Sequence, residues 1–110
     1  MESKILSSLG LCAKAGKLIR GVPMICEALK KSGTSKICLV IEASDTSENT
    51  HKKLNDKCNF YKADKIRIDS DGEALASAVG KSGSIGAVAI TDAGLSDMVK
   101  KLFDGQSVKE

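Results

Sequence analysis

The chain has 110 residues, 42% of them hydrophobic and 28% charged, and a formal net charge of +3. This composition is typical of a soluble globular protein. The length predicts one domain, residues 1–110 with a core over about 3–105, which can bury a core without disulfides or metals. One Tyr, two Phe and no Trp exclude a base-stacking surface of interleaved aromatic side chains.

The positive charge is concentrated at the start of the chain. Residues 1–36 hold seven Lys or Arg against two Glu, whereas residues 37–110 hold ten against twelve Asp or Glu. This asymmetry favours an anionic partner on one face of the protein.

The four cysteines lie at positions 12, 26, 38 and 58, too far apart for the paired spacing of a zinc site. We expect no metal and no cofactor. Cys12, Cys26 and Cys38 fall on or beside apolar faces and are predicted to be buried reduced thiols. The sequence does not decide whether Cys58 is buried. The sequence also indicates no signal peptide and no membrane span, so a cytoplasmic protein is expected.

In the first third of the chain, Ser3 is a predicted N-cap for a helix that places Ile5, Leu9 and Cys12 on one face. Residues 17–20 are short enough to form only a small strand. A second helix is predicted over Val22–Ser32, because Pro23 suits the first helical position and Gly33 is a plausible stop.

The rest of the chain alternates strands and helices. Strands are predicted at 37–41, 65–69 and 87–90, the second of them half-exposed or at an edge. Asp45 or Ser47 could cap a third helix that ends near Asn59 or Tyr61. Ser70 and Glu73 resemble a capping box for a fourth helix, and a fifth is expected to end near Gly105, with a loose tail at 106–110.

Strands that alternate with helices predict an α/β fold, a three-layer α/β/α sandwich around a small mixed sheet of about four strands. In such folds, the loops that leave the C-terminal ends of parallel strands usually carry the function. The loop Gly80–Gly86, which precedes the last strand, contains three glycines and is predicted to be flexible.

Two segments suggest contact with phosphate. Lys14, Lys17 and Arg20 precede the turn at Gly21 and the N-terminus of the second helix, where free N–H groups favour anions. The loop sequence GKSGS begins at Gly80, but Leu75 stands where a nucleotide-binding P-loop needs a glycine. Lys81 and a backbone without bulky side chains could still approach a large anion.

No catalytic group is indicated. A cysteine nucleophile needs a histidine partner, and the one histidine, His51, is predicted to be solvated on a helix. Capping explains Asp45 and Glu48 better than an acid pair does. We therefore expect a binding protein and no enzyme.

Three segments together resemble a known family. LGLCAKAGKLIRG, LVIEASDTSENTHKKLNDKCNFY and ALASAVGKSGSIGAVAITDAGL are similar to the bacterial YlxQ-type members of the ribosomal protein seven-Ae/thirty-e superfamily. The resemblance extends from about Lys4 to Leu102. It implies the same α/β/α sandwich, binding of structured RNA, typically kink-turns, association with ribosomal or translation components, and no catalytic activity.

The resemblance also implies which residues contact RNA. The first contact segment begins with the family's glycine at Gly21, within a basic frame. The second is the glycine loop, where Ile85 would pack against a bulged base. The implied RNA-binding residues are Lys14, Lys17, Arg20, Gly21, Lys30, Lys31, Lys81, Ser82 and Ile85.

The sequence departs from the family where bases are read. Pro23, Met24 and Glu27 stand where the family has Asn, Glu and Lys. Phosphate contacts are kept better than base contacts, and the former give affinity while the latter give selectivity. An alternative is a protein-interaction module that has lost specific RNA recognition and uses the apolar tip Val22–Met24.

Overall fold

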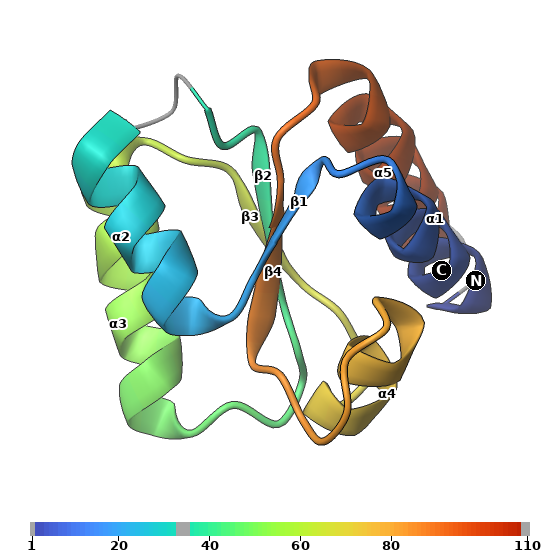
Figure 1. Ribbon diagram of the computed structural model, residues 1–110, viewed down its shortest axis with the longest axis horizontal. Helices are drawn as coiled ribbons and strands as arrows, with labels where there is room; N and C mark the ends of the chain where they lie inside the picture. The colour runs from blue at the N-terminus through green and yellow to red at the C-terminus, as the bar shows by residue number, and fades with distance from the viewer. Residues whose placement is uncertain (1, 33–35, 109–110) are drawn as a thin grey trace.

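The computed structural model describes residues 2–32 and 36–108, which form five helices and four strands. The helices are α1 (Glu2–Lys14), α2 (Val22–Ser32), α3 (Glu48–Tyr61), α4 (Gly72–Ala78) and α5 (Ala93–Val108). The strands are β1 (Leu18–Arg20), β2 (Leu39–Glu42), β3 (Lys65–Arg67) and β4 (Ala87–Ile90). α2 and α3 cover one face of the sheet and α1, α4 and α5 the other (Figure 1), which confirms the predicted three-layer sandwich.

The sheet is mixed, with strand order β1-β4-β2-β3. β4 is antiparallel to both β1 and β2, whereas β2 and β3 are parallel. β1, β2 and β3 therefore run in the same direction, and their C-terminal ends meet at one edge of the sheet. β3 lies at an outer position, as predicted for this half-exposed strand.

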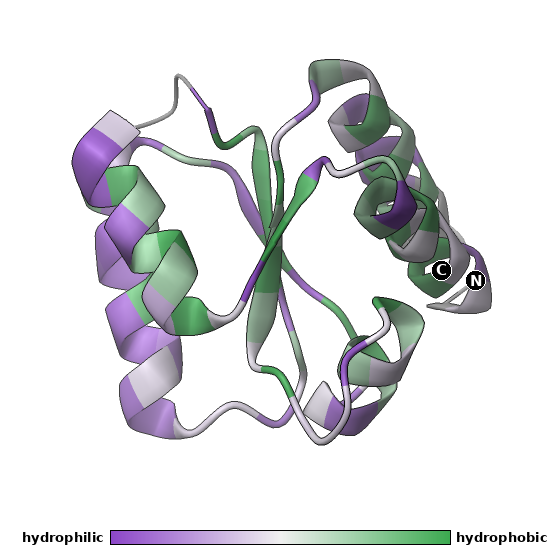
Figure 2. Ribbon diagram, in the orientation of Figure 1, coloured by the Kyte–Doolittle hydropathy of each residue, from purple (hydrophilic) through white to green (hydrophobic). Residues whose placement is uncertain are grey.

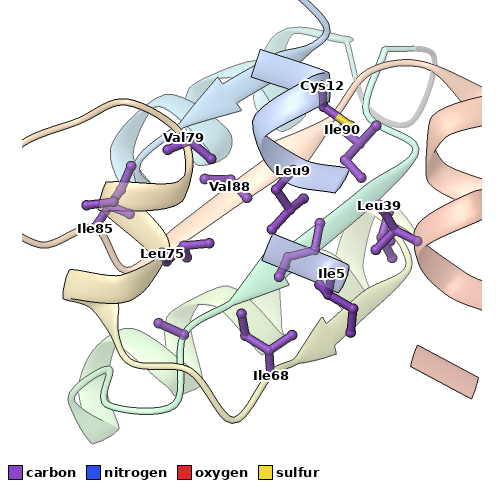
Figure 3. Packing of buried hydrophobic residues seen from close by; sticks show 14 residues of the cluster. Ile5, Leu9, Cys12, Leu39, Ile68, Leu75, Val79, Ile85, Val88 and Ile90 are labelled. Atoms are coloured by element: carbon purple, nitrogen blue, oxygen red, sulfur yellow. The ribbon is translucent and has the colours of Figure 1, made fainter. Parts of the chain in front are cut away.

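The core has two parts, one on each face of the sheet. The alternation of side chains along β2 sends Leu39 and Ile41 to the α1 side and Val40 to the α2 side. Ile5 and Leu9 of α1 lie in the first part, as predicted from their spacing (Figure 3). Figure 2 shows the hydrophobic residues gathered along the strands and the inner helix faces.

The helix caps differ in part from the prediction. Ser47 caps α3, because its hydroxyl accepts a hydrogen bond from Thr50 N. The cap of α4 is Asp71, which accepts from Ala74 N, so the capping box at Ser70 is wrong. Ser3 is also wrong as a cap, since α1 already includes Glu2. The proposed stop at Gly33 lies outside the described residues.

Two further predictions needed correction. α5 continues past Gly105 to Val108, so residues 106–108 are helical, and 109–110 lie outside the described residues. Cys58 is buried on the inner face of α3, whereas Cys26 and Cys38 are only half-buried. Burial raises the pKa of Cys58 to about 11 and also raises that of Cys12, so both are poor nucleophiles at neutral pH.

Candidate nucleic-acid interface

A groove of about 590 Å³ lies at the edge where β1, β2 and β3 end. Its walls come from three segments that are distant in the sequence: the β1–α2 turn, the β2–α3 loop with the first turns of α3, and the loop before β4. The lining residues are Arg20, Gly21, Val22, Pro23, Asp45, Thr46, Thr50, Lys53, Lys81, Ser84, Ile85 and Gly86. Three of these are cations and one is an acid, so the groove favours an anion.

The direction of the strands explains why these segments meet. α2 and α3 follow β1 and β2, so both begin at the same edge, and β4 starts there because it runs the opposite way (Figure 1). Gly21 N donates to Ala87 O at 2.9 Å, and Ala43 N donates to Gly86 O at 2.9 Å. These bonds join the three walls of the groove.

The N-terminus of α2 opens beside the groove. Gly21 O accepts the first helical hydrogen bond, from Ile25 N at 3.0 Å, which makes Gly21 the cap residue. Its φ of +97° suits glycine, and a glycine has no side chain that could cap the helix. The first turn of α2 contains no acidic residue, so the partial positive charge of this helix end is not offset from within the turn.

Arg20 is the cation that joins the groove to a second hollow. Its Nε donates to Val79 O at 3.1 Å, which holds the side chain across the end of α4. The second hollow, of about 430 Å³, is bordered by Arg20, Lys14 and Gly80. Lys14 therefore lies beside the groove without lining it.

Gly72 links two walls of the groove. Its N–H donates to Asp45 Oδ1 at 2.8 Å, and its carbonyl accepts from Ile85 N at 3.0 Å. A Cβ at this position would overlap Ser84 Oγ and lie 2.9 Å from Ile85 O. The loop after β2 and the loop before β4 can therefore approach each other only because this residue has no side chain.

We expect Gly72→Ala to lower the free energy of unfolding by about 2 kcal/mol, because the Ile85 carbonyl must shift to admit the methyl group. Urea denaturation followed by circular dichroism measures this change. Gly94→Ala is the control, since a Cβ there meets only Asp92 Oδ1 at 3.5 Å. Equal stability of the two variants would show that the loops are not held together through Gly72.

The structure brings only some of the predicted residues together. Arg20, Gly21, Lys81 and Ile85 line the groove, and Ser82 is exposed in the same loop. Lys17 lies at the opposite end of β1, where its carbonyl accepts from Thr91 N at 3.0 Å. Lys30 and Lys31 lie in the last turn of α2, about 12–14 Å along the helix from its start.

Ile85 was expected to pack against a bulged base of the RNA, but in the structure its side chain is buried. Only 6% of it is exposed, and it packs in the core among residues of α4 and β4 (Figure 3). It forms the floor of the groove and offers little surface to a ligand. Ile85 N donates to Gly72 O at the start of α4, and the side chain packs in the same cluster as Leu75 of that helix, so contacts with α4 direct it inward.

Lys53 and Thr50 are groove residues that the sequence analysis did not identify. Both lie in the first two turns of α3, on the side next to the groove. The signal was present: the polar segment 42–50 follows a buried strand, and such loops gather at the C-terminal edge of a sheet. What was missing was the strand order that places α3 beside α2.

A buried carboxylate supports the wall formed by the β2–α3 loop. Glu42, at the end of β2, has an exposed fraction of 0%. It accepts hydrogen bonds from Lys65 Nζ and Thr46 Oγ1, and His51 Nδ1 lies 2.8 Å from its Oε2. Arg67 Nη2 also donates to Thr46 Oγ1 at 3.2 Å. Thr46, a lining residue of the groove, is thus positioned by its hydrogen bonds with Glu42 and Arg67.

This network corrects the prediction of a solvated His51. Its side chain is 33% exposed and is paired with Glu42, because the first turns of α3 lie over the end of β2. Burial raises the pKa of Glu42, but the hydrogen bonds from Lys65, Thr46 and His51 outweigh it, so the pKa is lower than the ordinary value of 4.5. Glu42 is therefore an ionised structural group.

Two features are absent from the described residues, a metal-binding cluster and a membrane-spanning helix. Residues 2–32 and 36–108 contain no group of three or more His, Cys, Asp or Glu side chains placed to hold a metal ion. Among the helices in these two ranges, none combines the length and the apolar character needed to cross a bilayer.

The fold and the groove together define a small α/β/α protein with a basic groove at one edge of its sheet. The chain belongs to the ribosomal protein L7Ae/L30e/S12e/Gadd45 family, whose model matches residues 3–100. This agrees with the resemblance seen in the sequence.

Individual relatives are similar over most of their length. The RNA-binding protein YlxQ of Bacillus subtilis (strain 168) is 33% identical over 96 residues, which cover 87% of this chain and 91% of the relative. The RNA-binding protein YlxQ of Enterococcus faecium is 31% identical over 104 residues, 94% and 95% of the two chains. A solved structure of a protein with unknown function from Bacillus halodurans C has a TM-score of 0.81 and 34% identity, with 92% and 97% coverage.

Proposed function

We propose that this chain is an RNA-binding protein that holds structured, kink-turn-like RNA in the groove at the C-terminal edge of the sheet. The observation that carries the proposal is that Arg20, Lys53 and Lys81, from three separate segments, converge on one groove. Membership of the L7Ae/L30e/S12e/Gadd45 family and the likeness to two proteins named YlxQ support it. A binding role, without catalysis, is part of the proposal.

The proposed recognition depends mainly on phosphate and shape. Pro23 has no backbone N–H to donate, and Met24 is 60% exposed without a polar group. Glu27 is paired with Lys31, with 3.7 Å between Oε2 and Nζ, and its charge repels phosphate. Because base edges are read by side-chain donors and acceptors, we expect this helix start to contribute affinity and only modest selectivity.

The test compares a kink-turn RNA with a plain RNA duplex of equal length in gel-shift titrations across a salt series. We expect binding to both, tighter for the kink-turn, with affinity that falls steeply as salt rises because bound phosphates release counterions. Equal affinity for the two RNAs would show that the protein binds RNA by nonspecific charge attraction and does not recognise the kink-turn. The absence of binding at low salt would contradict the proposal altogether.

A second candidate function is a protein-interaction module, which the exposed Met24 next to the groove favours. Capture of the same protein partner with and without nuclease, lost in Met24→Asp, would support this candidate. Loss of all partners on nuclease treatment would support RNA binding. Ribosomal or translation proteins as partners, and a cytoplasmic location, stay predictions in either case.

A further inference from the structure

An aromatic side chain stands exposed at the far end of α3. Phe60 is 77% exposed, more than the other large hydrophobic residues that are exposed in the described part of the chain. Its ring contacts that of Tyr61 edge to face, with 4.9 Å between centroids and 85° between planes. Tyr61 packs against the core on this side of the sheet. The exposed ring therefore contacts a partly buried ring, which limits its motion while most of its surface stays accessible.

Phe60 lies in line with two lysines on α3. Lys53, Lys57 and Phe60 are spaced by four and three residues, so they share one side of the helix. Lys53 lines the groove, and Lys57 lines a hollow of about 440 Å³ together with Asp56, Phe60 and Tyr61. From Lys53 to Phe60 the helix rises about 10 Å. α3 thus runs from the groove, which its first two turns line, to its last turn, which carries Phe60.

This arrangement matches the chemistry of an unpaired RNA strand. Lys53 lies in the groove, Lys57 follows one helical turn later, and the ring of Phe60 follows Lys57. Phosphates pair with lysines, and bases stack on aromatic rings without regard to sequence. The carboxylate of Asp56, on the opposite side of Phe60 from Lys57 in the helical order, repels phosphate. The sugar-phosphate chain is then expected on the Lys57 side, with the base over the ring.

We propose that α3 binds an unpaired RNA strand that extends from the RNA in the groove, with Lys57 on a phosphate and a base stacked on Phe60. This inference rests on the proposed function, because the groove supplies the RNA from which the strand extends. The continuity of Lys53 and Lys57 with the groove favours RNA over a protein as the occupant of this surface.

The experiment uses the full chain and a kink-turn RNA, either bare or with a four-adenine single-stranded extension at its 5′ or its 3′ end. We expect one of the two extensions to tighten binding by about tenfold, the contribution of one stacked base. Phe60→Ala should abolish this gain, and Phe60→Tyr should keep it. Leu11→Ala is the matched control, because Leu11 is 58% exposed and lies on α1, across the sheet.

A second readout follows the base itself. With 2-aminopurine in the extension, stacking on Phe60 should quench its fluorescence in the wild type and not in Phe60→Ala. If neither extension tightens binding, or if Phe60→Ala keeps the gain, the inference is wrong while the groove can still bind RNA. If the bare RNA does not bind at low salt, the proposed function fails and the inference fails with it.

Discussion

The double variant Lys53→Glu/Lys81→Glu is expected to bind kink-turn RNA about 100-fold more weakly than the wild type near 0.1 M salt. Two cations that line the groove from different segments become anions, so attraction to phosphate is replaced by repulsion. The slope of log affinity against log salt should fall by about two, one for each phosphate contact that is lost. Gel-shift titrations at four or more salt concentrations measure both quantities.

The matched control is Lys30→Glu/Lys31→Glu, which makes the same change of charge in the last turn of α2. At about 12–14 Å from the helix start, these residues lie beyond the screening length of physiological salt, which is about 8 Å. Affinity within about threefold of the wild type is expected. If the control variant lost as much affinity as the groove variant, RNA would be attracted by the overall charge and the groove would not be its binding site.

The variant Glu42→Gln is expected to unfold more easily than the wild type at pH 7, by about 2–3 kcal/mol. The amide removes the negative charge from a site that is fully buried and leaves Lys65, whose side chain is 12% exposed, without an ionic partner. Urea denaturation at pH 7 measures the loss. Glu73→Gln, which changes an exposed residue in the first turn of α4, is the control and should have little effect.

The pH dependence follows from the direction of the pKa shift of Glu42. Its pKa is lower in the folded protein than its ordinary value of 4.5, so the unfolded chain binds the proton more readily. The stabilisation is complete above the unfolded pKa and is lost as pH falls through the folded pKa. The difference in stability between wild type and Glu42→Gln should therefore shrink below about pH 4.5. A difference that stayed constant down to pH 2 would show that Glu42 is not held ionised by its neighbours.

The elements of the fold followed from local patterns in the sequence. The helix at Val22–Ser32 and the strand at Ala87–Ile90 were predicted with the bounds that the structure has. Both are marked by signals within a few residues: a proline at the first helical position in one case, and an unbroken apolar run after a glycine-rich loop in the other. Where several capping residues were adjacent, as at Ser70 and Asp71, the local pattern did not decide between them.

The candidate site was predicted less completely, because a groove is formed by segments that are distant in the chain. Arg20 of the basic segment and Lys81 of the glycine loop were identified, and both line the groove, whereas Lys14 and Lys17 do not. Lys53 was missed, and Lys30 and Lys31 were included although they lie at the other end of α2. A count of charges along a sequence does not show which end of a helix faces a given edge of the sheet.

The sequence by itself determined the alternation of strands and helices, which depends on neighbours along the chain, and the excess of cations in residues 1–36. Only the tertiary structure decided that Arg20, Lys53 and Lys81 share a groove. It also decided that Ile85 is buried and that His51 forms a hydrogen bond with Glu42. The reason is the strand order β1-β4-β2-β3. It follows from long-range pairing and the burial of both sheet faces, which no local pattern encodes.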